Sequence, residues 1–431
     1  IVCALPVEYN AICLLFDQFW DENGDEYGRA TGDHNQYTTG CIGKQDIVVA
    51  LLPYMGKAQA ARAATNLRTS YNALELVLLV GICGVVPHVA GRDILLGDVV
   101  ISKSVVQYGL GRQYPDTFVR KDTADTNLNQ PTRDIRSLLL LLETDRGMDL
   151  LEGQTAGYLQ ELQAKAAKSR RLPKDRYRYP GSDRDRLFEP AYRHRHRTAM
   201  SCICRDCGSD SEPVCEEAMR LTCETLGCET SHLVRRAGIE EMRNLETQGG
   251  PSGQNPSLVV GSVASGDTVM KSAAHRDRIA AGEDVVAFEM EGAGLWEEVP
   301  CVIVKGACDY ADCHKSKEWQ PFAAATAAAA AKAVLNRFTA TDRRDTSPVQ
   351  AGPGHGSVDC LERSLVEDGR WISRNHVQSI DGDGSARIRV GNDWEKDAFV
   401  GGGSENRAGS IKAGGRSVVH IGNRYGGQGQ S

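Results

Sequence analysis

The chain has 431 residues, of which 41% are hydrophobic and 25% are charged, enough for a large core and two or three domains. Its 50 basic and 57 acidic residues argue against a general nucleic-acid binder. No run of about 18 apolar residues occurs, so we expect no membrane role. The first residues are typical of a buried strand rather than a signal peptide, and fourteen cysteines without a secretion signal are typical of reduced thiols. We therefore expect a cytoplasmic protein.

Apolar runs typical of strands recur along the first 340 residues. They lie at 1–7, 46–53, 74–82, 93–102, 258–265, 284–290 and 301–309. Residues 57–73, between the second and third runs, are rich in helix formers. Strands that alternate with helices in this way predict an α/β domain with a largely buried sheet.

The regular pattern breaks between about 144 and 256, where the chain is polar and rich in arginine. This region contains Cys202, Cys204, Cys207, Cys215, Cys223 and Cys228. Cys204 and Cys207 form a C-x-x-C pair, but no second pair follows at the usual spacing, so we expect no zinc site. We interpret the region as an insertion of helices and loops. Its basic stretch at 168–197 is either a solvated surface or a contact for an anionic ligand.

After a helical segment at 321–338 the composition changes to a Gly- and Ser-rich tail, residues 341–431. Two windows of the tail, 384–394 and 415–425, align at an offset of 31 residues. Each window has alternating side chains, then Gly-Asn, one variable position and an aromatic residue. The windows predict two short β-forming repeats, and a disordered extension is the alternative.

Five motifs occur in an order that resembles the nucleoside phosphorylase and nucleosidase superfamily, in the form found in fungal NOD-like receptor proteins. They are CALPVEYNA at 3–11, VGICGVVPHVAGRDILLGDVVIS at 80–102, VASGDTVMKS at 263–272, AFEMEGAGLW at 287–296 and VKGACDYAD at 304–312. The resemblance covers residues 1–338. It implies a catalytic domain at 1–340 with a three-layer α/β/α fold, in which a purine nucleoside lies across the strand ends of a central mixed sheet.

The resemblance implies two catalytic carboxyl groups. Asp309 corresponds to the general acid that protonates the departing base, whereas Asp312 is expected to have a structural role. Glu8 corresponds to the glutamate that activates water in the nucleosidases. Phosphorylases carry a Gly-Asp-Pro-x-Arg loop at this place, and an Arg and a Ser where this chain has Leu79 and Ile82. Hydrolysis is therefore favoured over phosphorolysis.

The resemblance also implies which residues contact the sugar and the base. The expected ribose-binding residues are Glu291, Met290 and Glu289, and the expected base-binding residues are Val269, Met270, Cys83 and Gly84. A carboxylate such as Glu291 can accept hydrogen bonds from both ribose hydroxyls. Val269 stands where the family commonly has an aromatic residue that stacks on the base, so the identity of the base stays open, with purine favoured over pyrimidine.

Basic residues near these motifs suggest a charged 5′ end on the substrate. Arg112, Lys271 and Arg276 are candidate phosphate-binding residues, accompanied by His275 and Lys315. Clustered Arg and Lys bind phosphates well, so a nucleotide such as ATP is an option. Each residue taken alone is typical of a surface charge.

Together these features predict a homo-oligomeric N-ribosyl hydrolase for a purine nucleoside or nucleotide, without metal or organic cofactor. Two alternatives stay open, a phosphorylase that uses inorganic phosphate and a nucleoside-binding signalling module without turnover. The two tail windows resemble the amyloid-signalling motifs that couple some fungal effectors to NOD-like receptors. A NOD-like receptor is therefore an expected partner of the tail.

Overall fold

The computed structural model divides the chain into two compact units, Ile1–Thr341 and Asp342–Ser431, each described here by itself. In the first unit the structure describes residues 1–338, apart from 23, 25–26, 122–127, 129–130, 198–201, 209–211, 214 and 248–254. In the second it describes only strands, at 360–367, 370–382, 387–390, 393–394, 403–413, 418–421 and 424–425.

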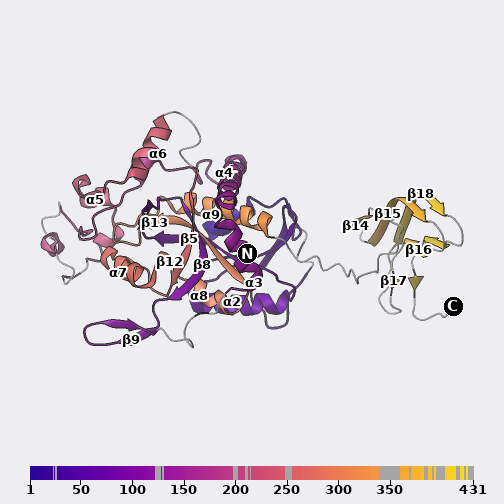
Figure 1. Cartoon of the computed structure of the whole chain (residues 1–431), viewed down its shortest axis with the longest axis horizontal. Coiled ribbons are helices and arrows are strands. Elements are labelled where there is room, and N and C mark those ends of the chain that lie inside the picture. The colour runs from indigo at the N-terminus through magenta and orange to yellow at the C-terminus, as the bar shows by residue number, and fades with distance from the viewer. Residues whose placement is uncertain are drawn as a thin grey trace. The chain divides into compact units, whose positions relative to one another are not determined.

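The first unit is built on a mixed sheet whose order in the described residues is β12-β11-β8-β13-β5-β1-β4-β3-β2 (Figure 1). Its strands are β1 (Val2–Cys3), β2 (Gln18–Phe19), β3 (Tyr37–Ile42), β4 (Gln45–Leu51), β5 (Val77–Val85), β8 (Val99–Gln107), β11 (Leu258–Ser265), β12 (Val285–Glu289) and β13 (Cys301–Asp309). β13 runs parallel to β5 and antiparallel to β8, and β12 also pairs antiparallel with the end of β5. Each apolar run predicted from the sequence overlaps one of these strands.

Helices cover both faces of the sheet. The longer ones are α1 (Pro6–Cys13), α2 (Lys57–Ser70), α3 (Arg133–Leu142), α4 (Asp145–Lys168), α6 (Ala237–Thr247), α7 (Ala273–Glu283) and α9 (Gln320–Arg337), and the short ones are α5 (Cys223–Leu226) and α8 (Gly292–Trp296). Helix α9 contacts α1, α4 and the sheet, whereas α2 contacts α8 (Figure 1). Side chains of β5 alternate between the two faces of the sheet, which explains the helix layer on each face. Leu78 and Val80 pack with the alanines of α9, whereas Val77 and Leu79 pack with those of α2. The predicted three-layer α/β/α class is confirmed.

The predicted insertion begins with a regular helix. Thr144 caps α4 through its side chain, and Leu151, Leu159 and Leu162 are buried where α4 contacts α9. This helix therefore belongs to the domain core, and the irregular part of the region starts at Ser169. We call residues 169–256 the insertion. It contains α5, α6 and the 3₁₀ turns Ser182–Arg184, Ile203–Asp206, Ala218–Arg220 and Thr230–His232.

Two small hairpins complete the first unit. One is formed by β6 (His88–Val89) and β7 (Arg92–Asp93), and the other by β9 (Gly111–Gln113) and β10 (Phe118–Arg120), which projects away from the sheet (Figure 1). Among the described residues, no helix is long and apolar enough to cross a membrane.

The tail unit pairs its strands at one constant offset. β15 (Arg370–Gly382) runs parallel to β18 (Gly403–Ala413), β16 (Arg387–Val390) to β19 (Val418–Ile421), and β17 (Asp393–Trp394) to β20 (Arg424–Tyr425). Representative partners are Ile372 with Gly403, Arg387 with Val418, and Asp393 with Arg424, each 31 positions apart. β14 (Cys360–Glu367) pairs antiparallel with β15. The structure thus pairs the two predicted windows in register, while their Gly-Asn positions, 391–392 and 422–423, lie outside the described residues.

Candidate functional site

Three strand ends meet at one point of the sheet. Gly84, near the end of β5, pairs with Asp309 of β13 on one side and with Phe288 of β12 on the other. Ligands of open α/β sheets bind beyond strand ends of this kind. A cavity of about 990 Å³ opens here, and we call it the strand-end cavity.

Most of the site residues predicted from the sequence line the strand-end cavity. They are Glu8, Cys83, Gly84, Val269, Met270, Lys271, Glu289, Met290, Glu291 and Asp309. Arg112 lies instead on the exposed hairpin strand β9. Arg276 is 1% exposed, and its guanidinium donates to the carbonyl of Tyr310 at 2.6 Å and pairs with Asp277 at 2.7 Å. Neither of these two arginines lines the cavity.

Glu8 is held rigidly at the first turn of α1, which Pro6 begins. Its Oε2 accepts hydrogen bonds from the backbone amides of Ala4 (2.9 Å) and Leu5 (2.8 Å), and its Oε1 accepts from the amide of Ile82 (2.9 Å). A Cβ at Gly81 would collide with this carboxylate, so the glycine gives Glu8 its place beside β5. Burial raises the pKa of Glu8, against the opposing effects of Lys305 and the backbone donors.

Glu291 forms a buried ion pair with a lysine that the sequence analysis did not select. The Nζ of Lys305 lies 3.3 Å from Glu291 Oε2, and Glu291 Oε1 accepts from the amide of Gly56 at 3.3 Å. Burial alone would lower the pKa of Lys305, but Glu291, Glu8 and Glu289 outweigh it and raise that pKa. The signal in the sequence was a lone charge inside the apolar run 301–309, a position at which a buried lysine requires a partner.

Glu289 is occupied by backbone contacts. Its carboxylate accepts hydrogen bonds from the amides of Glu291 (2.9 Å) and Gly292 (2.8 Å), where α8 begins. Burial raises the pKa of Glu289. These contacts fix the turn between β12 and α8, and they thereby orient Glu291 and Met290 at the cavity wall.

Asp309 ends β13 with its carboxylate held from two sides. Oδ1 accepts from the amide of Ala311 at 2.8 Å and pairs with Lys315 Nζ at 3.1 Å, while the thiol of Cys308 donates to Oδ2 at 3.3 Å. The absence of a side chain at Gly84 leaves room for Asp309, since a Cβ there would lie 2.7 Å from Oδ1. The neighbouring Asp312 accepts from the amide of His314 at 2.8 Å, and burial raises its pKa.

Residues 1–175 match the family model described as Phosphorylase superfamily, and residues 371–426 match the model described as Het-s 218-289. The resemblance to the phosphorylase superfamily is confirmed. A nucleotide-binding leucine-rich repeat (NLR)-like protein of Hyaloscypha variabilis is 30% identical over 342 residues, which are 78% of this chain and 28% of that protein. The chain thus spans little more than a quarter of the length of this relative.

Solved structures with a likeness to this chain include a nucleosidase and a futalosine hydrolase. One is a 5′-methylthioadenosine/S-adenosylhomocysteine nucleosidase from Neisseria meningitidis, with 15% identity over 78% of this chain and 96% of that chain and a TM-score of 0.39. The other is a futalosine hydrolase mutant of Helicobacter pylori, with 14% identity over 78% of this chain and 96% of that chain and a TM-score of 0.41.

The side of the strand-end cavity lined by Val269 and Met270 also contains an aromatic ring that was not predicted from the sequence. Phe288 lines the cavity, and Tyr108 packs edge-on against it with ring centroids 5.8 Å apart. Met270 is 6% exposed, whereas Val269 is 47% exposed. The wall expected from Val269 and Met270 therefore also includes the ring of Phe288.

The insertion contributes one wall of the strand-end cavity. Its lining residues include Arg184, Arg186, Arg220, Met219 and Thr222. The three arginines form ion pairs with neighbouring carboxylates, which partly neutralise them. Within the described part of the chain, Lys271 and Lys317, which lie outside the insertion, also line the cavity and have no carboxylate partner.

The insertion is anchored next to Asp309. Arg236 of the insertion pairs with Asp185 at 2.7 Å, and the hydroxyl of Tyr310 donates to the same Asp185 oxygen at 2.7 Å. Because Tyr310 directly follows Asp309, this buried network joins the insertion to the end of β13.

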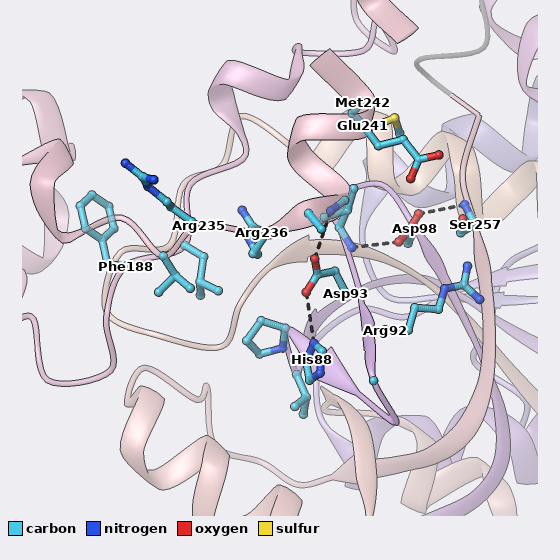
Figure 2. A pocket seen from close by; sticks show the side chains of 18 of the residues that line it. His88, Arg92, Asp93, Asp98, Phe188, Arg235, Arg236, Glu241, Met242 and Ser257 are labelled. Atoms are coloured by element: carbon cyan, nitrogen blue, oxygen red, sulfur yellow. Dashed lines mark hydrogen bonds and ion pairs between the residues drawn. The ribbon is translucent and has the colours of Figure 1, made fainter. Parts of the chain in front are cut away.

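A second cavity, of about 900 Å³, lies between the β6–β7 hairpin and the insertion (Figure 2). The three aspartates that line it, Asp93, Asp98 and Asp277, already have partners. Asp93 contacts His88 at 3.1 Å and accepts from the amide of Gly238 at 3.2 Å, and Asp98 accepts from the amide of Ser257 at 2.8 Å (Figure 2). None of the candidate catalytic carboxylates lines this cavity, so the chemistry is to be sought in the strand-end cavity.

Proposed function

We propose that the phosphorylase-superfamily domain hydrolyses the N-glycosidic bond of a purine nucleoside or nucleotide. The observation that carries this proposal is that Glu8, Glu291 and Asp309, which come from three separate motifs, line one cavity. A ribosyl hydrolase requires a general acid that protonates the departing purine, a group that binds the sugar, and a general base that takes a proton from water. These three carboxyl groups can supply all three roles.

In the proposed reaction, Asp309 donates one proton and Glu8 accepts another. As the C1′–N9 bond breaks, its electron pair passes to the purine, and Asp309 donates a proton to N7. Glu8 accepts a proton from the water whose oxygen bonds to C1′. Glu291 accepts hydrogen bonds from the ribose hydroxyls, while the ammonium of Lys305 lies 3.3 Å from its Oε2.

Hydrolysis is favoured over phosphorolysis by the charge near Glu8. Three buried carboxyl groups, those of Glu8, Glu289 and Glu291, lie around the buried ammonium of Lys305. A phosphate dianion bound there would face uncompensated negative charge at low dielectric, whereas water would not. Leu79 and Ile82 add no cation to this wall.

A nucleotide such as ATP is the proposed substrate within this class. Lys271 and Lys317 can meet a 5′ phosphate without first breaking an ion pair, and the arginines of the insertion add positive charge to the same cavity. A cytoplasmic, homo-oligomeric enzyme remains our prediction from the sequence.

The test is to incubate the full chain with nucleosides and nucleotides, with and without inorganic phosphate, and to identify the products. We expect free purine together with ribose or its 5′-phosphorylated form, at a rate independent of added phosphate. Ribose 1-phosphate and a strict need for phosphate would instead establish the phosphorylase. Tight ligand binding with no base released would establish a signalling module without turnover.

We further propose that the tail assembles with tails of its own kind and couples the enzyme to a NOD-like receptor. Three parallel strand pairs at the same 31-residue offset support this idea, because paired backbone ladders leave edges that can pair with further strands. The match to the Het-s 218-289 model and the NLR-like relative support it as well.

A further inference from the structure

Two groups of cysteine and histidine lie in and beside the insertion. The clamp cluster consists of His194, Cys223, Cys228 and His314, and the inner cluster of His196, Cys202, Cys204 and Cys215. In each cluster the four ligand atoms lie within 4.8 Å of one another. The described cysteines are all free thiols, so no disulfide accounts for either group.

The histidines of the clamp cluster turn their Nδ1 atoms toward each other. His194 Nδ1 and His314 Nδ1 are 3.3 Å apart, while their Nε2 atoms lie 3.0 Å from the carbonyl of Leu221 and 2.8 Å from that of Tyr192. A carbonyl can only accept, so each Nε2 donates its hydrogen to a carbonyl, and the Nδ1 of each ring is left facing the cluster, where it can ligate a metal. Metal-bound histidines typically donate their other N–H to a carbonyl in this way.

The spacing of the clamp cluster fits a tetrahedral zinc ion. Bonds of about 2.0 Å to nitrogen and 2.3 Å to sulfur place two nitrogens about 3.3 Å apart and a nitrogen about 3.5 Å from a sulfur. Cys223 Sγ is 3.7 Å from His194 Nδ1 and 3.5 Å from His314 Nδ1. Cys228 Sγ is 3.7 Å and 4.0 Å from the same two nitrogens.

The inner cluster has a similar spacing with three sulfurs. His196 Nδ1 lies 3.3 Å from Cys204 Sγ and 3.8 Å from Cys215 Sγ, and Cys202 Sγ lies 3.2 Å and 3.9 Å from the sulfurs of Cys204 and Cys215. Backbone amides donate to two of these sulfurs, from His196 to Cys204 at 3.4 Å and from Ala218 to Cys215 at 3.5 Å. Such donors stabilise thiolate charge.

We propose that each cluster binds one zinc ion. Sets of thiolate and imidazole ligands select zinc over magnesium or calcium, and four protein ligands are typical of a structural site. The insertion needs such support because its buried apolar side chains are few. They are Tyr177, Leu187, Phe188, Tyr192, Cys204, Ala218, Leu226 and Ile239 among the described residues. A structural metal supplies the folding free energy that a small core lacks.

The clamp zinc joins the insertion to the loop that follows Asp309. His314 belongs to that loop, whereas the other three ligands belong to the insertion. The next residue, Lys315, pairs with Asp309 at 3.1 Å. Zinc bound here therefore acts as a positioning element for the Asp309 loop and takes no part in the chemistry. This step rests on the proposed function only in calling Asp309 catalytic.

The first test is a metal count on the full chain, expressed with zinc and purified without chelator. We expect about two zinc ions per chain, with Cys223→Ser and Cys202→Ser each losing about one. Cys207→Ser is the matched control and should keep both ions, because its sulfur lies by the carbonyl of Ile203 and not in either cluster. Cobalt substituted for zinc should give the absorption of tetrahedral thiolate ligation, which surface-bound metal would not.

Thiol reactivity keeps the proposal testable if a serine variant fails to fold. In the unaltered chain a chelator should expose the five cluster cysteines to a thiol reagent. A chain without zinc whose cluster cysteines react equally with and without chelator would overturn the proposal.

The clamp itself is tested by hydrogen exchange, which requires no activity. The amides of Ala311 and His314 should exchange faster in Cys223→Ser than in Cys202→Ser, because only the former loses the zinc next to them. Equal exchange in the two variants would show that the clamp zinc does not hold the Asp309 loop. An unaltered chain that contains two zinc ions but shows no turnover would count against the proposed function. It would not count against the metal sites.

Discussion

The ammonium of Lys305 lies 3.3 Å from Oε2 of Glu291, with both side chains almost fully buried. Breaking a buried ion pair leaves an uncompensated charge, so this contact links the stability of the domain to the geometry of its candidate sugar ligand. The buried carboxyl groups of Glu8 and Glu289 also interact with the ammonium of Lys305, so its removal would affect them as well.

Replacing Lys305 with methionine should lower the free energy of unfolding by about 3–5 kcal/mol near neutral pH. The loss should be smaller at pH 5 than at pH 8. Lys305 lowers the pKa of Glu8 and Glu289, so its removal raises both further, and a carboxyl group with a raised folded pKa costs stability as pH rises. Chemical denaturation at the two pH values measures this. Lys332→Met, at a buried lysine of α9 that does not line the cavity, is the control and should leave ligand affinity unchanged. An equal loss at both pH values would contradict the charge argument.

Asp309→Asn should preserve the fold and reduce base release by about 10²–10⁴-fold, because an amide cannot deliver the proton to N7. Product formation under single-turnover conditions measures the chemical step, and the melting temperature of the variant provides the control for folding. Activity within about threefold of the unaltered chain would rule out Asp309 as the general acid.

Glu291→Gln should lower kcat/KM for ribosides more than for 2′-deoxyribosides, because only the riboside offers both hydroxyls to the carboxylate. The ratio of kcat/KM for the two substrate types, compared between the variant and the unaltered chain, measures the effect. If both substrates lose equally, Glu291 does not contact the 2′ hydroxyl.

Lys271→Ala should slow the hydrolysis of nucleotides and leave the hydrolysis of nucleosides nearly unchanged. The ammonium of Lys271 lines the cavity without a carboxylate partner in the described residues. The impairment should shrink as salt rises, because added ions screen an exposed charge pair. Arg112→Ala is the matched control, as Arg112 lies on the exposed β9 hairpin. Loss of the same size in both variants, or none in either, would remove the case for a nucleotide substrate.

The tail segment 382–431 should form fibrils with a cross-β spacing of about 4.7 Å, and the double change Val419→Pro and Ile421→Pro should abolish them. Both positions lie in β19, whose amides a proline would remove from the ladder with β16. Proline at Gln428, beyond β20, is the control. Fibre diffraction and seeded growth are the measurements, and a segment that stays monomeric when seeded would leave the tail as a tether.

The sequence predicted the sheet and the candidate carboxylates that line the strand-end cavity because apolar runs and ordered motifs are local signals. Charged partners far apart in the chain give no such signal, so Lys305 was missed, and Arg276 was expected to face a phosphate although it is buried against Tyr310. The cysteine clusters were missed for a related reason. Their ligands interleave along the insertion, and His314 lies 86 residues beyond Cys228, so no familiar metal-binding spacing appears.

The constant 31-residue register of the tail sets the distance between successive chains in any filament that the tails would form. If every chain adds two stacked strand layers, successive chains follow at about 9.4 Å along the axis, twice the strand spacing of about 4.7 Å. A domain of 341 residues has a radius of gyration of about 20 Å, far more than that interval. The first units of neighbouring chains could therefore not stack directly above one another at that interval.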